Sequence, residues 1–185
     1  MNKRDRPKLS GNITQLHVEI EDNPMENLLM CLEGLCAWIS DAITSLPNCE
    51  AVDKAPTCSP KVLVHCVQGQ SRSGAVIVAY LMRTLSLSYD AALEMSRTYN
   101  PNIFPNSGFA DQLRFWERLH YSIFVVSRIG DDAKVVTRKE YEDWECNRGI
   151  LRSREEVEVH TLRMETMKDL VVSLGQSKGK ESGIN

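Results

Sequence analysis

The chain has 185 residues, enough for one domain with a sizeable buried core and an appended segment. Because the net charge is −3 and no apolar run approaches the roughly 20 residues of a membrane span, we expect neither nucleic-acid nor membrane binding. The N-terminus is polar and does not resemble a signal peptide, and the six cysteines do not have the paired spacing of metal ligands. We therefore expect a reducing compartment, cytoplasmic or nuclear.

The first third of the chain predicts one strand and one long helix. Residues 1–12 are polar and basic, and we expect them to be disordered. Residues 13–20 alternate as a short strand does, and residues 21–24 read as a turn. Apolar residues then recur at helical spacing from 25 to 46. The prolines of residues 47–60 predict a loop.

A strand, a tight loop and a helix follow in direct succession. Residues 62–65 favour a strand, residues 66–74 are rich in Gly and Ser, and residues 75–82 form an apolar helical segment. Backbone N–H groups and the helix dipole converge in such a loop, so it can bind an anion. The loop contains Cys66, whose pKa we expect to fall into the range of roughly 3.5–7.5, and Arg72, whose guanidinium fits phosphate oxygens. The alternative is a buried structural cysteine beside a surface arginine.

Two capped helices are predicted after the loop. Ser88 is an N-cap for a helix that runs to about Tyr99 and ends at residues 100–101. Asn106 opens the next helix. The inner face of that helix comprises Phe109, Leu113, Trp116 and Leu119.

The last third of the chain is richer in charged residues. Residues 127–134 read as a linker, and capping boxes at 137–140 and 153–156 predict two helices. Apolar residues recur at heptad-like spacing in 154–174, which favours a helix on the domain's own surface, with a docking seam for a partner helix as the alternative. Residues 175–185 are predicted to be disordered.

The residues from His65 to Ser73 resemble the phosphate loop of the cysteine-based protein phosphatases in its dual-specificity form. The resemblance implies an α/β fold with a central sheet packed by helices. It implies that Cys66 is the nucleophile, that His65 holds the loop and helps to set the thiol pKa, and that Ser73 donates to the sulfur. The alternatives are a structural hydrogen bond for His65 and a helix N-cap for Ser73. The implied phosphate-binding residues are Val67, Gln68, Gly69, Gln70, Ser71 and Arg72.

A thiolate can displace an alkoxide from phosphorus only if the leaving oxygen is protonated, so a general acid is required. Asp22 follows the predicted strand, and residues 22–28 are similar to the acid loop of the same family, in which an asparagine follows five residues after the aspartate. Glu21, or an ordinary turn without a catalytic role, is the alternative. Asn106 resembles the asparagine that supports the phosphate loop, although its own sequence context indicates only an N-cap.

The resemblance covers residues 13–124, and residues 125–174 are predicted to be a charged helical extension. In the family, a β-α-β portion precedes the segment that corresponds to residues 13–20 and includes a strand that lies beside it. We therefore expect a central sheet that is truncated at its N-terminal side, with two unpaired strands or two strands that pair directly.

The predicted function is that of a phosphoric monoester hydrolase that needs no metal or cofactor. Neutral Val67, Gln68 and Gln70 favour phosphotyrosine and phosphoserine or phosphothreonine of proteins over an inositol lipid. The alternatives are a phosphate-binding regulatory module with weak or no turnover, because of the truncated sheet, and an interaction protein that acts through residues 154–174.

Overall fold

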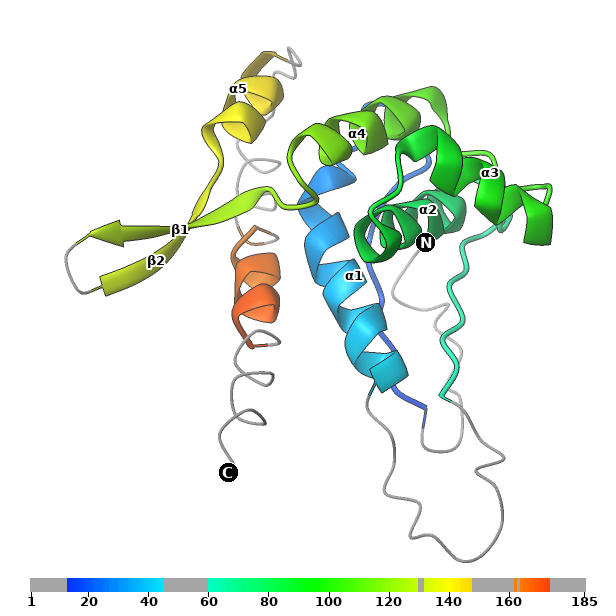
Figure 1. The fold of residues 1–185 in the computed structure, drawn as a ribbon, viewed down its shortest axis with the longest axis horizontal. Helices are drawn as coiled ribbons and strands as arrows, with labels where there is room; N and C mark the ends of the chain where they lie inside the picture. Colours follow the sequence, from blue (N-terminus) through cyan, green and yellow to red (C-terminus); the bar gives the residue numbers. More distant parts are fainter. Residues whose placement is uncertain (1–12, 45–59, 130–131, 148–161, 163, 174–185) are drawn as a thin grey trace, which may run out of the picture.

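The computed structural model describes residues 13–44, 60–129, 132–147, 162 and 164–173 (Figure 1). The helices and strands in chain order are α1 (Leu29–Thr44), α2 (Arg72–Leu85), α3 (Tyr89–Tyr99), α4 (Ser107–Arg118), β1 (Phe124–Ile129), β2 (Asp132–Thr137) and α5 (Lys139–Asn147). A further helical stretch covers residues 164–173. Four of these helices, α1 to α4, form the body of the molecule, while β1 and β2 extend away from it.

The predicted starts of α3 and α4 are confirmed because both depend on a local cap. Ser88 accepts a hydrogen bond from the Ala91 N–H at 3.4 Å, and Asn106 accepts one from the Phe109 N–H at 2.9 Å. Such caps contribute about 1 kcal/mol each to helix stability. The helix predicted after the glycine-rich loop is also present, and it begins at Arg72.

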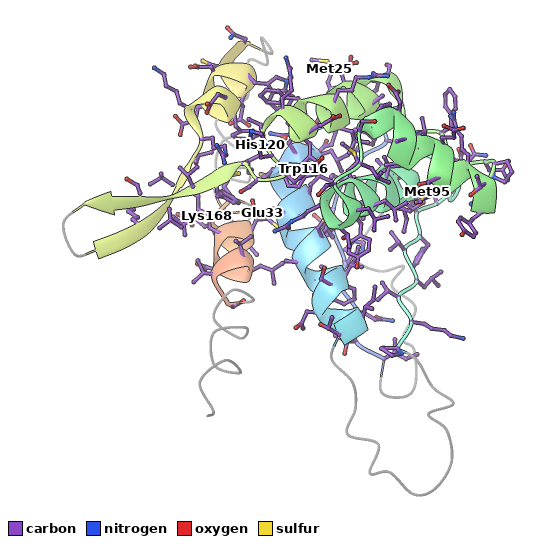
Figure 2. All side chains as sticks on the ribbon, in the orientation of Figure 1. Met25, Glu33, Met95, Trp116, His120 and Lys168 are labelled. Atoms are coloured by element: carbon purple, nitrogen blue, oxygen red, sulfur yellow. The ribbon has the colours of Figure 1, made fainter. Side chains whose placement is uncertain are left out.

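The core lies where α1, α2 and α4 meet. Trp116 (labelled in Figure 2), Phe109 and Leu113 of α4 are fully buried, as the inner face of that helix predicts. Val78 and Met82 of α2 are also fully buried. This packing holds α2, whose first residue is Arg72, against α1 and α4.

Neither of the two strands predicted before α2 is formed. Residues 13–20 and 62–65 are extended, and no sheet pairing reaches them among the described residues. Leu63 is 84% exposed. A strand forms only if a second strand supplies its hydrogen-bond partners, and an alternating sequence does not specify that second strand.

The one sheet in the described part of the chain lies elsewhere. β1 and β2 pair antiparallel, from Phe124 opposite Thr137 to Ile129 opposite Asp132. The prediction of a linker over 127–134 is therefore wrong, and the extension is not purely helical. The valine pairs of the two strands, Val125 with Val136 and Val126 with Val135, are β-branched and explain the hairpin.

The helical stretch over residues 164–173 lies on the domain's own surface, which is the favoured interpretation of the apolar spacing in residues 154–174. Met164 is buried, and Met167 and Val171 pack against the core. The stretch passes close to α1, because a Cβ atom on Gly34 would lie 3.0 Å from the Met167 sulfur and 3.1 Å from Leu170. The apolar face of residues 164–173 is thus occupied within the chain.

Several predictions fall outside the described residues: those for 1–12, for most of the loop 47–60, for the capping box at 153–156 and for 175–185.

Of the helices that are described, none alone has both the length and the apolar composition of a membrane span. α2 and α3 meet those two conditions only together, and they are bent by 118° relative to each other.

Candidate active site

The loop between the extended residues 62–65 and α2 curls through a left-handed glycine. Gly69 has a φ of +70°, a conformation that other L-residues rarely adopt. A Cβ atom on Gly69 would meet nothing within 4 Å. The backbone conformation of the loop, and not a lack of space inside the protein, therefore requires glycine here.

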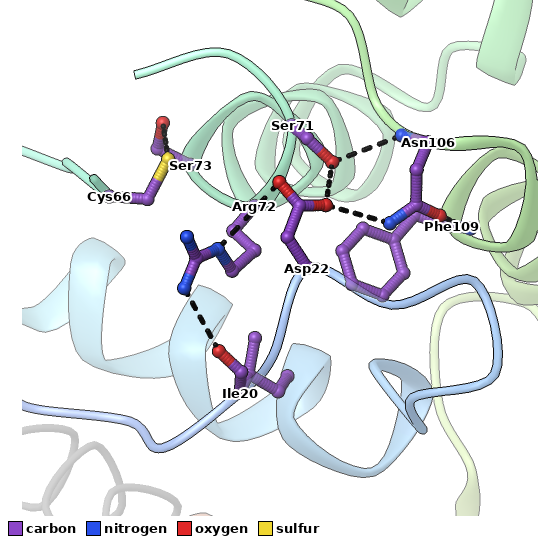
Figure 3. A network of polar contacts seen from close by, with 8 residues as sticks. All are labelled: Ile20, Asp22, Cys66, Ser71, Arg72, Ser73, Asn106 and Phe109. Carbon is purple, nitrogen blue, oxygen red and sulfur yellow. Dashed lines mark hydrogen bonds and ion pairs between the residues drawn. The ribbon is translucent and has the colours of Figure 1, made fainter. Parts of the chain in front are cut away.

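Cys66 and Ser73 face each other across this loop (Figure 3), with 3.3 Å between the Cys66 sulfur and the Ser73 hydroxyl. Partial burial raises the pKa of the Cys66 thiol. Hydrogen bonds from the Ser73 hydroxyl and from loop amides lower the pKa, and their combined effect is the larger one. The pKa falls from its ordinary value of 9.0 to about 7. The amides belong to Ser73, Gly69 and Gln68.

The alternative interpretation of Ser73, as a helix N-cap, is wrong. α2 begins one residue earlier, at Arg72, and its N-cap position is Ser71. Ser73 is buried and its hydroxyl lies against the thiol. Hydrogen bonds from the Ser73 hydroxyl and from the loop amides thus lower the Cys66 pKa.

Replacing Ser73 with alanine is expected to raise the Cys66 pKa from about 7 toward 9.0, because the thiolate loses its hydroxyl donor. The thiolate is the reactive form above its pKa, so the pH at which iodoacetamide alkylates Cys66 at half its maximal rate should move upward. Alkylation measured against pH by peptide mass spectrometry checks this. An unchanged midpoint in Ser73→Ala would show that the loop amides alone set the pKa.

Arg72 is the first residue of α2, and its guanidinium points back toward the loop before α1. One terminal nitrogen, Nη1, donates to the Ile20 carbonyl at 3.3 Å, and Nε lies 3.9 Å from the Asp22 carboxylate. Nε is buried and makes no hydrogen bond to any of the described residues. A buried donor without an acceptor is costly, and a phosphate oxygen is an acceptor of the right charge for it.

Asp22 is held against the same loop by two neutral donors. The Ser71 hydroxyl donates to Asp22 Oδ1 at 2.6 Å, and the Asn106 side-chain amide donates to the same oxygen at 2.8 Å. The Asn106 backbone N–H also donates to the Ser71 hydroxyl at 3.1 Å. Figure 3 shows this cluster on one side of Arg72, with Cys66 and Ser73 on the other. Three distant segments thereby meet at the start of α2.

The structure does not bring every predicted site residue into this cluster. His65 is exposed and makes no hydrogen bond within the described residues. Val67 and Gln68 are also exposed, whereas the Gln70 carbonyl accepts a hydrogen bond from the Phe104 N–H at 3.2 Å. The roles assigned to these side chains stay predictions, as do the catalytic roles of Cys66, Arg72 and the rest of the cluster.

Two residues of α4 that the sequence did not single out position the loop that carries Asp22. A Cβ atom on Gly108 would lie 1.9 Å from the Pro24 carbonyl oxygen, so the loop can pack on α4 only where α4 has no side chain. Gln112 is buried, accepts from the Leu28 N–H at 2.8 Å and donates to the Glu26 carbonyl at 2.8 Å. In the sequence, only Gly108, two residues after Asn106, could have indicated this close contact.

Comparison with known proteins bears directly on this arrangement. The family model described as the catalytic domain of dual specificity phosphatases matches residues 1–119. Human dual specificity phosphatase 28 is 37% identical over 111 residues, which are 60% of this chain and 55% of the relative. Dual specificity protein phosphatase MPK-4 of Drosophila melanogaster is 33% identical over 107 residues, which are 58% of this chain and 24% of the relative.

Two solved structures have the same fold. A crystal structure of a human DUSP28 variant has a TM-score of 0.51 at 35% identity, over 61% of this chain and 68% of that one. The human tyrosine phosphatase-like serine/threonine/tyrosine-interacting protein has a TM-score of 0.54 at 28% identity, over 63% and 69%. The predicted α/β fold class is confirmed by these neighbours, although the described residues contain only the β1–β2 sheet.

The chain spans about a quarter and about half of the lengths of the two curated relatives above. The family match nevertheless covers more than half of the chain, and it includes Asp22, the Cys66 loop and Asn106. The chain belongs to the dual specificity phosphatase family.

Proposed function

We propose that this chain is a protein phosphatase that hydrolyses phosphotyrosine and phosphoserine or phosphothreonine through a phosphocysteine intermediate. The observation that carries the proposal is the placement of the Cys66 sulfur, which lies 3.3 Å from the Ser73 hydroxyl and whose pKa is lowered to about 7 by hydrogen bonds from that hydroxyl and from the loop amides. Arg72, whose buried Nε makes no hydrogen bond to the described residues, is the first residue of the helix that follows the Cys66 loop. A nucleophile and an anion site thus share the N-terminus of α2.

In the first step, the Cys66 thiolate forms a bond to phosphorus while the bond from phosphorus to the ester oxygen breaks. The Arg72 guanidinium and the loop amides stabilise the charge on the phosphoryl oxygens. Asp22 gives a proton to the departing oxygen. Its Oδ1 accepts hydrogen bonds from Ser71 and Asn106, and its Oδ2 lies 3.9 Å from Arg72 Nε, so the carboxyl group is held beside the phosphate loop.

In the second step, water attacks the phosphocysteine and the bond from phosphorus to sulfur breaks. Asp22, now a carboxylate, takes the proton from the water and is ready for the next cycle. The Ser73 hydroxyl, 3.3 Å from the sulfur, stabilises the thiolate as it leaves. The enzyme returns to its starting protonation state, and inorganic phosphate is released.

The substrate class follows from the charge of the loop. Val67, Gln68 and Gln70 add no cation beside the phosphate, so the site offers nothing to the additional phosphates of an inositol lipid. A single phosphoryl group on a protein side chain needs only the loop and Arg72. Phosphorylated proteins are therefore the proposed substrates.

The experiment that tests the proposal is to trap the intermediate. The chain is mixed with p-nitrophenyl phosphate, quenched in acid within the first turnovers and digested for mass spectrometry. We expect one phosphoryl group on the peptide that contains Cys66 and none on the peptide that contains the exposed Cys146. Steady release of phosphate with no phosphoryl group on Cys66 would refute the mechanism.

A second candidate function is phosphate binding without turnover. It is favoured by the unpaired residues 13–20 and 62–65, because these flank Asp22 and Cys66 and lack the sheet that would hold them rigid. One solved neighbour is itself named a phosphatase-like interacting protein. Saturable binding of a phosphopeptide by a chain that releases no phosphate from it would favour this function over catalysis.

A further inference from the structure

The loop that carries Asp22 is bonded at its far end to a helix outside the residues that match the family. The match ends at residue 119, whereas α5 covers Lys139–Asn147. Asn27, at the end of the loop, is buried, and its side-chain amide donates to the Tyr141 hydroxyl at 2.7 Å and to the Glu145 carboxylate at 2.9 Å. These hydrogen bonds join residues more than one hundred positions apart.

The orientation of the Asn27 side chain is set from both ends. Its Oδ1 accepts from the Met30 N–H at 3.3 Å in the first turn of α1, which leaves both amide hydrogens for α5. The Tyr141 hydroxyl donates onward to the Glu145 carboxylate at 3.4 Å. The three side chains therefore form one hydrogen-bonded network.

Aromatic packing holds α5 in place for this contact. Tyr141 is 1% exposed, and its ring lies 5.8 Å from the ring of Trp144. Trp144 in turn stacks on Phe115 of α4, with 5.6 Å between ring centroids. The position of the Tyr141 hydroxyl is thus fixed by this aromatic packing.

The other side of the loop end rests on α4. Gln112 bonds the backbone at Glu26 and Leu28, and Pro24 packs against Gly108. The stretch from Pro24 to Leu28 is therefore held by α4 through its backbone and by α5 through the Asn27 side chain. Asp22 lies two residues before this stretch, in contact with Ser71 and Asn106.

We propose that α5 is a positioning element for the acid loop, defined here as residues 22–28, and that Tyr141 and Glu145 are its positioning residues. By holding Asn27, they restrict the loop so that Asp22 stays beside the phosphate loop. The proposal rests on the proposed function, in which Asp22 is the general acid. It gives a role in the reaction to a segment that lies beyond the family-matched residues.

The test compares Tyr141→Phe, Glu145→Ala and the double variant with Glu142→Ala as the matched control. Glu142 lies on the same helix and is exposed, and its replacement makes the same change in charge. For the double variant we expect kcat to fall by about tenfold to a hundredfold on a phosphoserine peptide, because a displacement near 1 Å costs that much. The loss on p-nitrophenyl phosphate, whose leaving group needs little protonation, should be much smaller.

Hydrogen exchange supplies a readout that does not depend on turnover. In Tyr141→Phe, which keeps the buried ring, the amides of residues 23–28 should exchange faster while those of α2 keep the exchange rates of the unmodified chain. The same pattern should be stronger in the double variant and absent in Glu142→Ala. This measurement decides the positioning role even if the double variant folds poorly, because the single variant removes one hydroxyl only.

The outcomes separate this inference from the proposed function. If the unmodified chain turns over and the double variant matches Glu142→Ala in both substrates and in exchange, the positioning role is overturned and the proposed function stands. Equal losses on both substrates, with exchange unchanged in residues 23–28, also overturn it. A chain without any turnover overturns the proposed function, while faster exchange confined to 23–28 would still support the hold of α5 on the loop.

Discussion

Replacement of Cys66 with serine is expected to abolish phosphate release at every pH. The Cys66 thiol has a pKa of about 7 and supplies a thiolate at neutral pH. A serine hydroxyl in the same place stays protonated at neutral pH, so it is a poor nucleophile. Loss of a nucleophile costs on the order of a millionfold in kcat. Hydrolysis of p-nitrophenyl phosphate from pH 5 to pH 9 measures the effect.

The matched control for this variant is Cys146→Ser. Cys146 lies on α5 and is exposed, and it takes no part in the proposed chemistry. We expect this variant to keep the activity of the unmodified chain, and both variants to unfold at similar temperatures. Activity of Cys66→Ser within tenfold of the unmodified chain would mean that the reaction does not proceed through this thiol.

Replacement of Asp22 with asparagine is expected to slow hydrolysis of phosphoserine and phosphotyrosine peptides by roughly 10²–10⁴-fold, the usual contribution of a general acid. Asparagine keeps an oxygen that can accept from Ser71 and Asn106 but has no proton to give. Nitrophenolate leaves without a proton, so the loss on p-nitrophenyl phosphate should be smaller. The ratio of kcat/KM on the two kinds of substrate is the measurement.

The control for the acid is Glu21→Gln, because Glu21 is the neighbouring carboxylate that the sequence left as an alternative. Glu21 is exposed, and we expect its replacement to leave the ratio of kcat/KM on the two kinds of substrate unchanged. Equal losses on both substrates in Asp22→Asn would point to damage to the Arg72 side of the site, since the Asp22 carboxylate lies 3.9 Å from that guanidinium. A larger effect from Glu21→Gln would transfer the role of the acid to Glu21.

The helices and the phosphate loop could be predicted from the sequence because their determinants are local. Ser88 and Asn106 lie within three residues of the N–H groups that they cap. Cys66 and Ser73 are only seven positions apart, and the left-handed φ of Gly69 concerns a single residue. Local hydrogen bonds and backbone preferences decide such features, whatever the rest of the chain does.

The strands could not be predicted in this way. Residues 13–20 and 62–65 have the pattern of strands and remain unpaired, whereas the segment taken for a linker pairs within the β1–β2 hairpin. A strand gains its hydrogen bonds from another segment, so its formation depends on whether a suitable segment lies beside it. Alternation along one segment carries no information about that second segment.

The sequence by itself determined the chemistry at the start of α2: a thiol, a guanidinium and a loop suited to phosphate. Only the tertiary structure decided how Asp22 is held, because Ser71, Asn106 and Arg72 reach it from segments at least 49 positions away. The link from Asn27 to Tyr141 spans 114 positions, and the sequence pattern that includes Asn27 gives no sign of this partner. Contacts of that kind depend on how the helices pack, which is a property of the whole fold and of no single stretch of sequence.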